Sequence, residues 1–418
     1  MVNAFVLSSA AAGRGVGRPT GPRPFPSVPC APADEDVVGE LCSRMFASLP
    51  RRDQRERGEQ YVRGLLTAPG RKSVRNIATH AGGGSAVQRL HHFVSGSTWD
   101  WQPIRAALAS HLQRITAPAA WVVQVLTIPK SGEHSVGVAR RFVPQLGQTL
   151  RGQQALGVWF ASPAMSMPVN WRLLLPEQWV RDAHLRHRAE LPEDVSYETL
   201  EESAAAVVTE TLQHAEVEPR PVVLDVPGAW TDIGVLRSFA AAGLPLLGRL
   251  GAGTRLLMAD PALPGYGAGP LTAEQILTSV RGLRRTVTWH DAPQNTTRTS
   301  SVVLVRVRAA HGTGTVAQRP LYLLGEWDGQ WRVPTRIWLT DVAAPAARLL
   351  RLTKLTHRVS HDLAEVGARV GLRDYEGRSF RGWHRHVTLS SVAHTACLLT
   401  GGTGAAAAPE TGSPRLTA

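Results

Sequence analysis

The sequence predicts an α/β protein that begins with a small helical domain and carries a β-rich insertion late in the chain. Apolar residues recur at helical spacing from residue 35 to about residue 115. Short apolar runs bounded by turn residues follow from Trp121 onward, with helical stretches between them. Alternating β-rich segments then fill about 284–340. The chain has 418 residues, 43% of them hydrophobic, which suffices for a substantial core.

Composition divides the chain into four parts. Gly, Pro, Ala, Ser and Arg dominate residues 1–34, and residues 399–418 have a similar composition, so we expect a disordered basic lead-in and a disordered tail. Residues 35–115 are expected to form a helical DNA-binding domain. Residues 116–398 are expected to form the core, interrupted by the insertion at about 284–340.

Within the core, four apolar runs predict strands, and two longer periodic stretches predict helices. The strands are expected at 121–128, 155–160, 171–175 and 221–224. The helices are expected at 197–214 and 344–370.

The overall charge favours a polyanionic partner. The formal net charge is +13 and the sequence pI is about 10.7, and basic proteins of this kind bind nucleic acid by neutralising phosphates. Nearly all of the positive charge is arginine, so a compositional bias of the genome is the alternative explanation. We expect double-stranded DNA as the partner.

Other compartments and chemistries are disfavoured. The sequence has no apolar run near the roughly 20 residues that cross a bilayer, so we expect no membrane partner and a cytoplasmic, nucleoid-associated location. Three scattered cysteines are too few for a disulfide framework or a zinc ribbon.

The helical domain carries many arginines at exposed positions. Four of its basic residues are candidates for contacts with the DNA backbone: Arg52, Arg55, Arg71 and Lys72. A solvated arginine face with no ligand is an equally weighted alternative.

Several motifs, in the same order along the chain, resemble those of the DDE transposases of bacterial insertion sequences, most closely the seven-oh-one group. They are RDQRERGEQYVRGLL, HHFVSGSTWDWQPIRAAL, WVVQVLTIPKSGEHSVGVARRF, WRLLLPEQW and DYEGRSFRGWHRHVTL. The resemblance implies an RNase H-like mixed sheet core with a β-rich insertion before the last catalytic helix. It also implies three carboxylates that hold two divalent ions about 4 Å apart for phosphodiester cleavage.

Two of the three expected carboxylates are replaced in this chain. In the first strand motif, Gln124 and Val125 stand where the family has two aspartates. The second acid is kept as Asp225, at the end of the run PVVLD. In the helix before DYEGRS, Ser360 falls on the catalytic glutamate and Gly367 on a lysine. Asp225 is therefore the only catalytic candidate and a weak candidate metal ligand.

Neighbouring acids do not obviously replace the lost ones. On a helix, Asp362 lies about 200° and Glu365 about 140° around the axis from Ser360, so neither faces the same way. More distant acids, namely Glu133, Asp232 and Glu376, are the alternative ligands. We therefore expect no required cofactor, and Mg²⁺ or Mn²⁺ only if catalytic activity survives.

The last motif adds further candidates for DNA contact. These are Arg378, Arg381, His384 and Arg385 in the motif, together with Lys130 after the first strand. The alternative is a C-terminal segment that packs on the sheet with Phe380 and Trp383 buried.

The leading hypothesis is a transposase-like DNA-binding protein without catalytic activity, whose role could be regulatory. One alternative is an active DDE transposase or endonuclease that uses relocated carboxylates. Another is a relic or interaction scaffold without DNA affinity. A homodimer is compatible with each hypothesis, because transposases often dimerise.

Overall fold

The computed structural model describes most of the chain between residues 35 and 403. The described ranges are 35–81, 84–143, 147–215, 218–226, 234–310, 320–329 and 331–403. The predicted lead-in, 1–34, and most of the predicted tail lie outside these ranges. Residues 399–403 lie within the last helix, which ends at Thr403, so the tail was predicted to begin too early.

Five strands form the centre of the sheet. They are β1 (Ala120–Pro129), β3 (Gln148–Ala161), β4 (Ser166–Leu174), β5 (Val222–Asp225) and β6 (Leu246–Arg249). Their spatial order is β4-β3-β1-β5-β6. Strand β3 is antiparallel to β1 and β4, whereas β5 is parallel to both β1 and β6. This order and these directions confirm the predicted RNase H-like core.

The β-rich insertion extends the same sheet beyond β6. The path continues β12-β11-β10-β7-β8, and β9 pairs with β10. The bounds are β7 (Arg255–Met258), β8 (Leu271–Thr272), β9 (Arg285–Asp291), β10 (Thr296–Ala309), β11 (Leu321–Trp327) and β12 (Arg336–Thr340). At the other edge, β2 (Ala139–Val143) pairs with β3. Helix α10 (Ala273–Ser279) follows β8.

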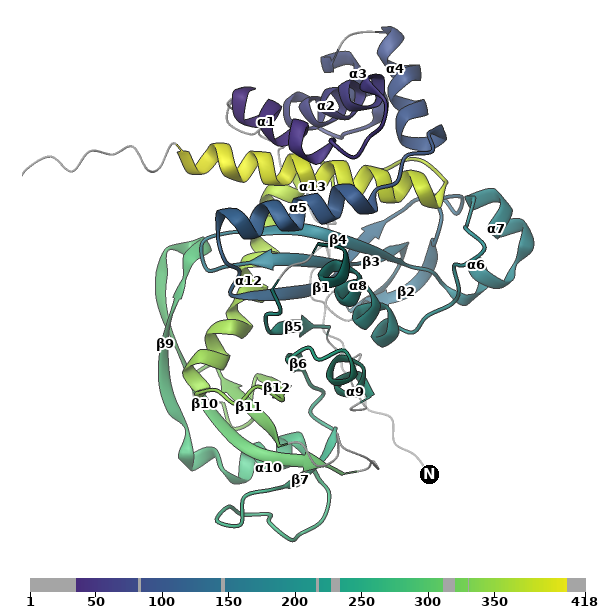
Figure 1. The fold of residues 1–418 in the computed structure, drawn as a ribbon. Helices are drawn as coiled ribbons and strands as arrows, with labels where there is room; N and C mark the ends of the chain where they lie inside the picture. The colour runs from purple at the N-terminus through teal and green to yellow at the C-terminus, as the bar shows by residue number, and fades with distance from the viewer. Residues whose placement is uncertain are drawn as a thin grey trace, which may run out of the picture.

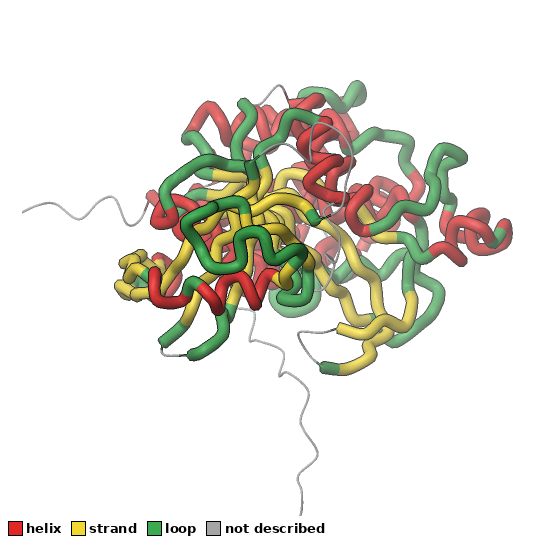
Figure 2. The backbone as a smooth tube through the Cα atoms, turned by 90° about the horizontal axis from the view of Figure 1, so that it is seen from below, coloured by secondary structure: helices red, strands yellow, loops and turns green. Residues whose placement is uncertain are grey.

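Helices cover both faces of the central strands (Figures 1 and 2). Helix α8 (Leu200–Ala215) packs on one face, where Asn170 of β4 donates to the carbonyl of Val207. Helices α12 (Ala346–Arg369) and α13 (Phe380–Thr403) pack on the other, where the Trp171 indole donates to Ser391. Three shorter helices are α6 (Glu177–Arg181), α7 (Ala183–Ala189) and α9 (Gly234–Ala241).

The N-terminal helices lie around α13: the first four sit above it in Figure 1, and the fifth lies below it, against α8 and β4. They are α1 (Glu35–Met45), α2 (Arg52–Thr67), α3 (Val74–Ala81), α4 (Gly84–His91) and α5 (Gln102–Ile115). The hydroxyl of Tyr61 in α2 lies 2.9 Å from Nδ1 of His386 in α13. The two chain ends of the described protein are thus packed together. None of the described helices is both long enough and apolar enough to cross a membrane.

Candidate functional site

The three positions that correspond to the expected carboxylates meet at one place in the fold. Gln124 lies opposite Asp225 in the register of β1 with β5, so the two side chains point to the same face of the sheet. On that face, Nε2 of Gln124 donates to Oγ of Ser360 in α12 at 2.8 Å. The residues that meet here are an amide, one carboxylate and a hydroxyl, where the resemblance implies three carboxylates.

Helix α12 does not supply a replacement acid at this point. The side chain of Asp362 is buried, with 1% of its residue surface exposed. Its carboxylate accepts from Ser166 at 2.8 Å and pairs with both Nε and Nη2 of Arg358. Asp362 therefore anchors α12 to β4 and faces away from Ser360, as the helical angle predicts. Gly367 is also buried, and a Cβ there would lie 2.9 Å from a methyl group of Leu372.

The one retained carboxylate is engaged by an arginine. Oδ1 of Asp225 lies 3.1 Å from Nη1 of Arg249 on β6, and the two side chains are only 20% and 27% exposed. Sequence reasoning did not single out Arg249. The sequence held one signal, since the apolar run LLGR ends in a charged residue as the run VVLD does. That the two strand ends are neighbours follows only from the order of the strands in the sheet.

This donor set does not fit two divalent cations. Such ions bind clusters of anionic oxygen ligands, whereas Asp225 and Arg249 together carry no net charge and Gln124 and Ser360 are neutral. The carbonyl oxygen of Gln124 is buried and has no hydrogen-bond partner within the described residues, so it is one neutral ligand at most.

The relocated acids are held elsewhere or lie outside the described part of the chain. Glu133 pairs with Arg151 at 2.9 Å, and Glu376 pairs with Arg71 at 3.2 Å. Asp232 falls in an undescribed segment. Among the residues that the structure describes, no group of three or more His, Cys, Asp or Glu side chains is arranged to hold a metal ion.

Three of the predicted DNA contacts are wrong because the side chains are buried. Lys72 donates to the carbonyl of Ala68 within the protein. His384 contacts the guanidinium of Arg105. Arg385 donates to the carbonyls of Val94 and Trp99. His384 and Arg385 thus pack α13 against the rest of the protein, so the alternative interpretation of this motif, with Trp383 buried, describes it better.

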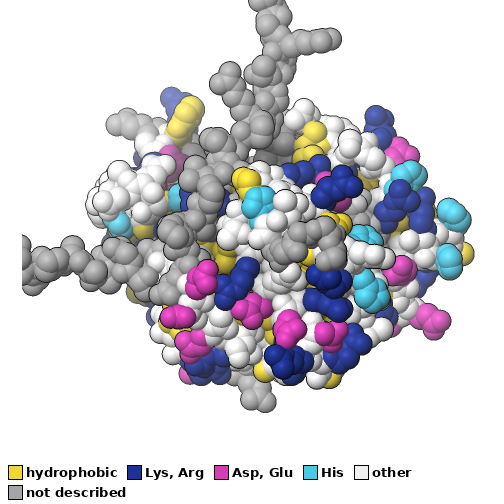
Figure 3. Space-filling view, turned by 90° about the horizontal axis from the view of Figure 1, so that it is seen from above, with side chains coloured by type: hydrophobic (Ala, Val, Ile, Leu, Met, Phe, Trp, Pro, Cys, Tyr) yellow, Lys and Arg dark blue, Asp and Glu magenta, His cyan; other side chains and the backbone are white. Residues whose placement is uncertain are grey.

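On α1 and α2 the arginines form ion pairs along the helix. The pairs, each four residues apart, are Arg44–Glu40, Arg52–Glu56, Arg57–Asp53 and Arg63–Glu59. Figure 3, which looks down on this end of the molecule, shows basic and acidic side chains interspersed. The face that includes Arg52 is therefore close to charge-balanced, and of the predicted contacts on α2 only Arg55 has no acidic partner within the described residues; it donates to the carbonyl of Leu49.

A second group of basic residues gathers around the loop 374–378, and we call it the loop cluster: Arg71, Lys130 and Arg378. Arg71 pairs with Glu376, Nζ of Lys130 donates to the carbonyl of Tyr375 at 2.5 Å, and the Arg378 carbonyl accepts from Val136. Arg71 and Arg378 are exposed. Burial, reinforced by the nearby charge of Arg71, lowers the pKa of Lys130 to about 8. Arg381, the remaining candidate, is exposed at the start of α13.

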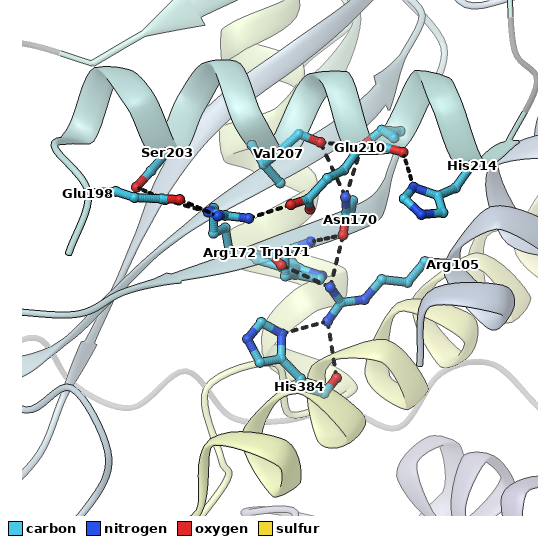
Figure 4. Close-up of polar contacts among 11 residues, drawn as sticks. Arg105, Asn170, Trp171, Arg172, Glu198, Ser203, Val207, Glu210, His214 and His384 are labelled. Atoms are coloured by element: carbon cyan, nitrogen blue, oxygen red, sulfur yellow. Dashed lines mark hydrogen bonds and ion pairs between the residues drawn. The ribbon is translucent and has the colours of Figure 1, made fainter. Parts of the chain in front are cut away.

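A cavity of about 520 Å³ lies between α5, β4 and the start of α13, and Arg381 is one of its lining residues. Its wall includes Trp101, which stacks on His384 with ring centroids 4.8 Å apart. Arg172 on β4 pairs with Glu198 and Glu210 at its edge (Figure 4). Three of its charged side chains are thus engaged with one another.

Comparison with known proteins gives a family match. The model of the DDE superfamily endonuclease family matches residues 44–310. Among solved structures, the chain is similar to the piggyBac transposase in a synaptic complex with hairpin DNA. That likeness has 11% sequence identity and a TM-score of 0.35, and it covers 90% of this chain and 80% of that chain. No curated protein matches the sequence.

Proposed function

The chain belongs to the DDE superfamily endonuclease family, and we propose that it is a DNA-binding member that no longer cuts DNA. The observation that carries the proposal is the contact between Gln124 and Ser360 beside an Asp225 that is paired with Arg249. Cleavage by this family's chemistry needs carboxylates that hold divalent ions in line with the phosphodiester. The row of Gln124, Asp225 and Ser360 supports the proposal, because it offers one carboxylate where such chemistry needs three.

DNA binding is supported by the net charge of +13 and by the loop cluster. The loop cluster brings basic residues from three separate segments to the loop 374–378, where Arg378 is exposed and has no acidic partner within the described residues. Arginine and lysine gain affinity for duplex DNA by displacing condensed counterions. We assign double-stranded DNA as the partner, and a nucleoid location follows from that assignment. Kinship with the seven-oh-one group and a regulatory role are further parts of the proposal.

The test measures binding and cleavage on the same preparation. Fluorescence anisotropy with a labelled duplex should show affinity that falls steeply between about 50 and about 200 mM salt. Supercoiled plasmid incubated with the protein and Mg²⁺ or Mn²⁺ should stay uncut. The Asp225→Ala variant should bind DNA as the wild type does.

Two outcomes would contradict the proposal. Metal-dependent nicking by the wild type that disappears in Asp225→Ala would show an active site built from other ligands. The absence of salt-dependent duplex binding would instead favour the alternative hypothesis of an interaction scaffold without DNA affinity. Equal nicking by both proteins would indicate a contaminating nuclease, and repurification must then remove it for the proposal to stand.

A further inference from the structure

We infer that Arg249 has taken over the electrostatic role of the metal ions, as an internal cation that neutralises Asp225 and keeps divalent metal out. The inference rests on the proposed function, since it assumes that the site is a former DDE centre. It adds a named residue that excludes metal, and it predicts which substitutions would recreate a metal site.

The first argument is position. Gln124, Asp225 and Arg249 lie on three neighbouring parallel strands, β1, β5 and β6. Gln124 is in register with Asp225, and Leu224 is in register with Gly248, so Arg249 is the next residue across from Asp225. Neighbouring strands are about 4.8 Å apart, which places all three side chains in one row under α12.

The second argument is charge. A guanidinium group 3.1 Å from Asp225, the only carboxylate of the site among the described residues, occupies one of its oxygens and repels any approaching cation. Both side chains are more than two-thirds buried, so water screens the pair less than it would at the surface. Arginine is always protonated in proteins, so this cation persists across the physiological pH range.

The third argument is the unsatisfied oxygen of Gln124. Its amide nitrogen donates to Ser360, and its buried carbonyl oxygen has no partner within the described residues. Buried hydrogen-bond acceptors without partners are uncommon. This oxygen belongs to the residue that stands where the resemblance implies a metal-binding aspartate. The former site thus keeps an inward-facing oxygen but has lost the negative charge that would attract a cation.

The experiment restores the acids with and without Arg249. The first variant carries Gln124→Asp and Ser360→Glu, and the second adds Arg249→Gln. Binding of Mn²⁺ alone, without DNA, is followed by the loss of the free-ion signal in electron paramagnetic resonance. We expect the second variant to bind Mn²⁺ about tenfold or more tightly than the first, because the repelling charge has been removed.

A matched control replaces an arginine outside the site. Arg255→Gln on β7, an exposed position, is added to the first variant in place of Arg249→Gln and should leave Mn²⁺ affinity unchanged. Thermal unfolding establishes that each protein is folded at the assay temperature. Arg249→Ser is the second choice if the glutamine variant melts below that temperature.

The outcomes separate this inference from the proposed function. Equal Mn²⁺ affinity with and without Arg249, or no binding by either folded variant, would overturn the role of Arg249 and leave the proposed function intact. Plasmid nicking by the wild type would overturn the proposed function itself. An affinity gain in the Arg249 variant, with an uncut plasmid in the wild type, supports both.

Discussion

At the scale of single residues, buried arginines hold this molecule together. Arg105 of α5 is 3% exposed, and all of its guanidinium nitrogens donate to neutral acceptors in β4 and α13. The acceptors shown in Figure 4 are Asn170 Oδ1, the Trp171 carbonyl, and the ring and carbonyl of His384. Nε also donates to Thr388 Oγ1. One side chain therefore ties the helical domain to the sheet and to the last helix.

Removal of this side chain should be strongly destabilising. Arg105→Ala leaves several buried acceptors without a donor, so we expect the free energy of unfolding to fall by about 3–5 kcal/mol. Urea unfolding monitored by tryptophan fluorescence measures it. Arg114→Ala, at an exposed position on the same helix, should change stability by less than about 0.5 kcal/mol. Similar losses in both variants would contradict this account of Arg105.

Lys130 gives the proposed DNA interface a pH dependence. Its pKa is lowered to about 8, chiefly by burial, so above pH 8 the free protein carries a neutral amine at this position. Phosphate contact favours the charged form, and binding above pH 8 therefore requires proton uptake. Between pH 8 and 9 duplex affinity should fall by up to about tenfold. The Lys130→Arg variant should lose this pH dependence. If the wild-type affinity did not change between pH 8 and 9, Lys130 would not be part of the DNA interface.

The sequence identified some site residues and missed others for a clear reason. The family motifs located Gln124, Asp225 and Ser360, because each of these residues can be aligned within one continuous segment of the sequence. Arg249 and Arg105 act through contacts between segments, and such contacts depend on sheet register and helix docking. Lys72, His384 and Arg385 were predicted as DNA contacts because charge was taken as a sign of exposure.

At the scale of elements, α13 is a polar helix in a buried place. Its first four turns bury histidine, serine and threonine side chains alongside Trp383 and Val387. Such a helix has no apolar stripe of helical period, which explains why the motif was interpreted as a surface and the tail was predicted to begin before Thr403. The central strands have continuous apolar runs, and the structure confirms those predictions.

The buried histidines of α13 should make the protein sensitive to acid. Burial lowers the pKa values of His386 and His394 to about 4, whereas an unfolded histidine titrates near 6.5. The unfolded chain thus binds more protons as the pH falls from 6.5 towards 4, and stability is lost over that window. Each histidine should cost about 2 kcal/mol between pH 7 and pH 5.

Urea midpoints at pH 7 and pH 5 check this expectation. The His394→Gln variant should lose less stability between the two pH values than the wild type does, by about 2 kcal/mol, whatever its stability at pH 7. His187→Gln, an exposed position on α7, is the matched control and should keep the wild-type difference. An unchanged difference in His394→Gln would show that this histidine is not responsible.

At the scale of the whole molecule, the net charge is larger than the charge that is free to contact DNA. The chain carries a formal charge of +13, yet the arginines of α1 and α2 are mostly paired along their helices and several others are buried. Charges that already have a close acid, or that lie inside the protein, displace few counterions from DNA. The slope of affinity against salt should therefore correspond to far fewer contacts than the net charge suggests.

The loop cluster should account for a measurable part of that slope. Each lost phosphate contact lowers the slope of log affinity against log salt by about 0.9, so the Arg378→Gln variant should lower it by about 1, whereas Arg71→Gln, whose wild-type side chain pairs with Glu376, should change it less. Arg52→Gln, whose wild-type side chain pairs with Glu56, and Arg181→Gln on α6 should leave it nearly unchanged. Salt titrations by fluorescence anisotropy provide the slopes. If Arg52→Gln lowered the slope as much as Arg378→Gln does, the interface would extend over the paired face of α2, and the ion pairs there would have to open on DNA.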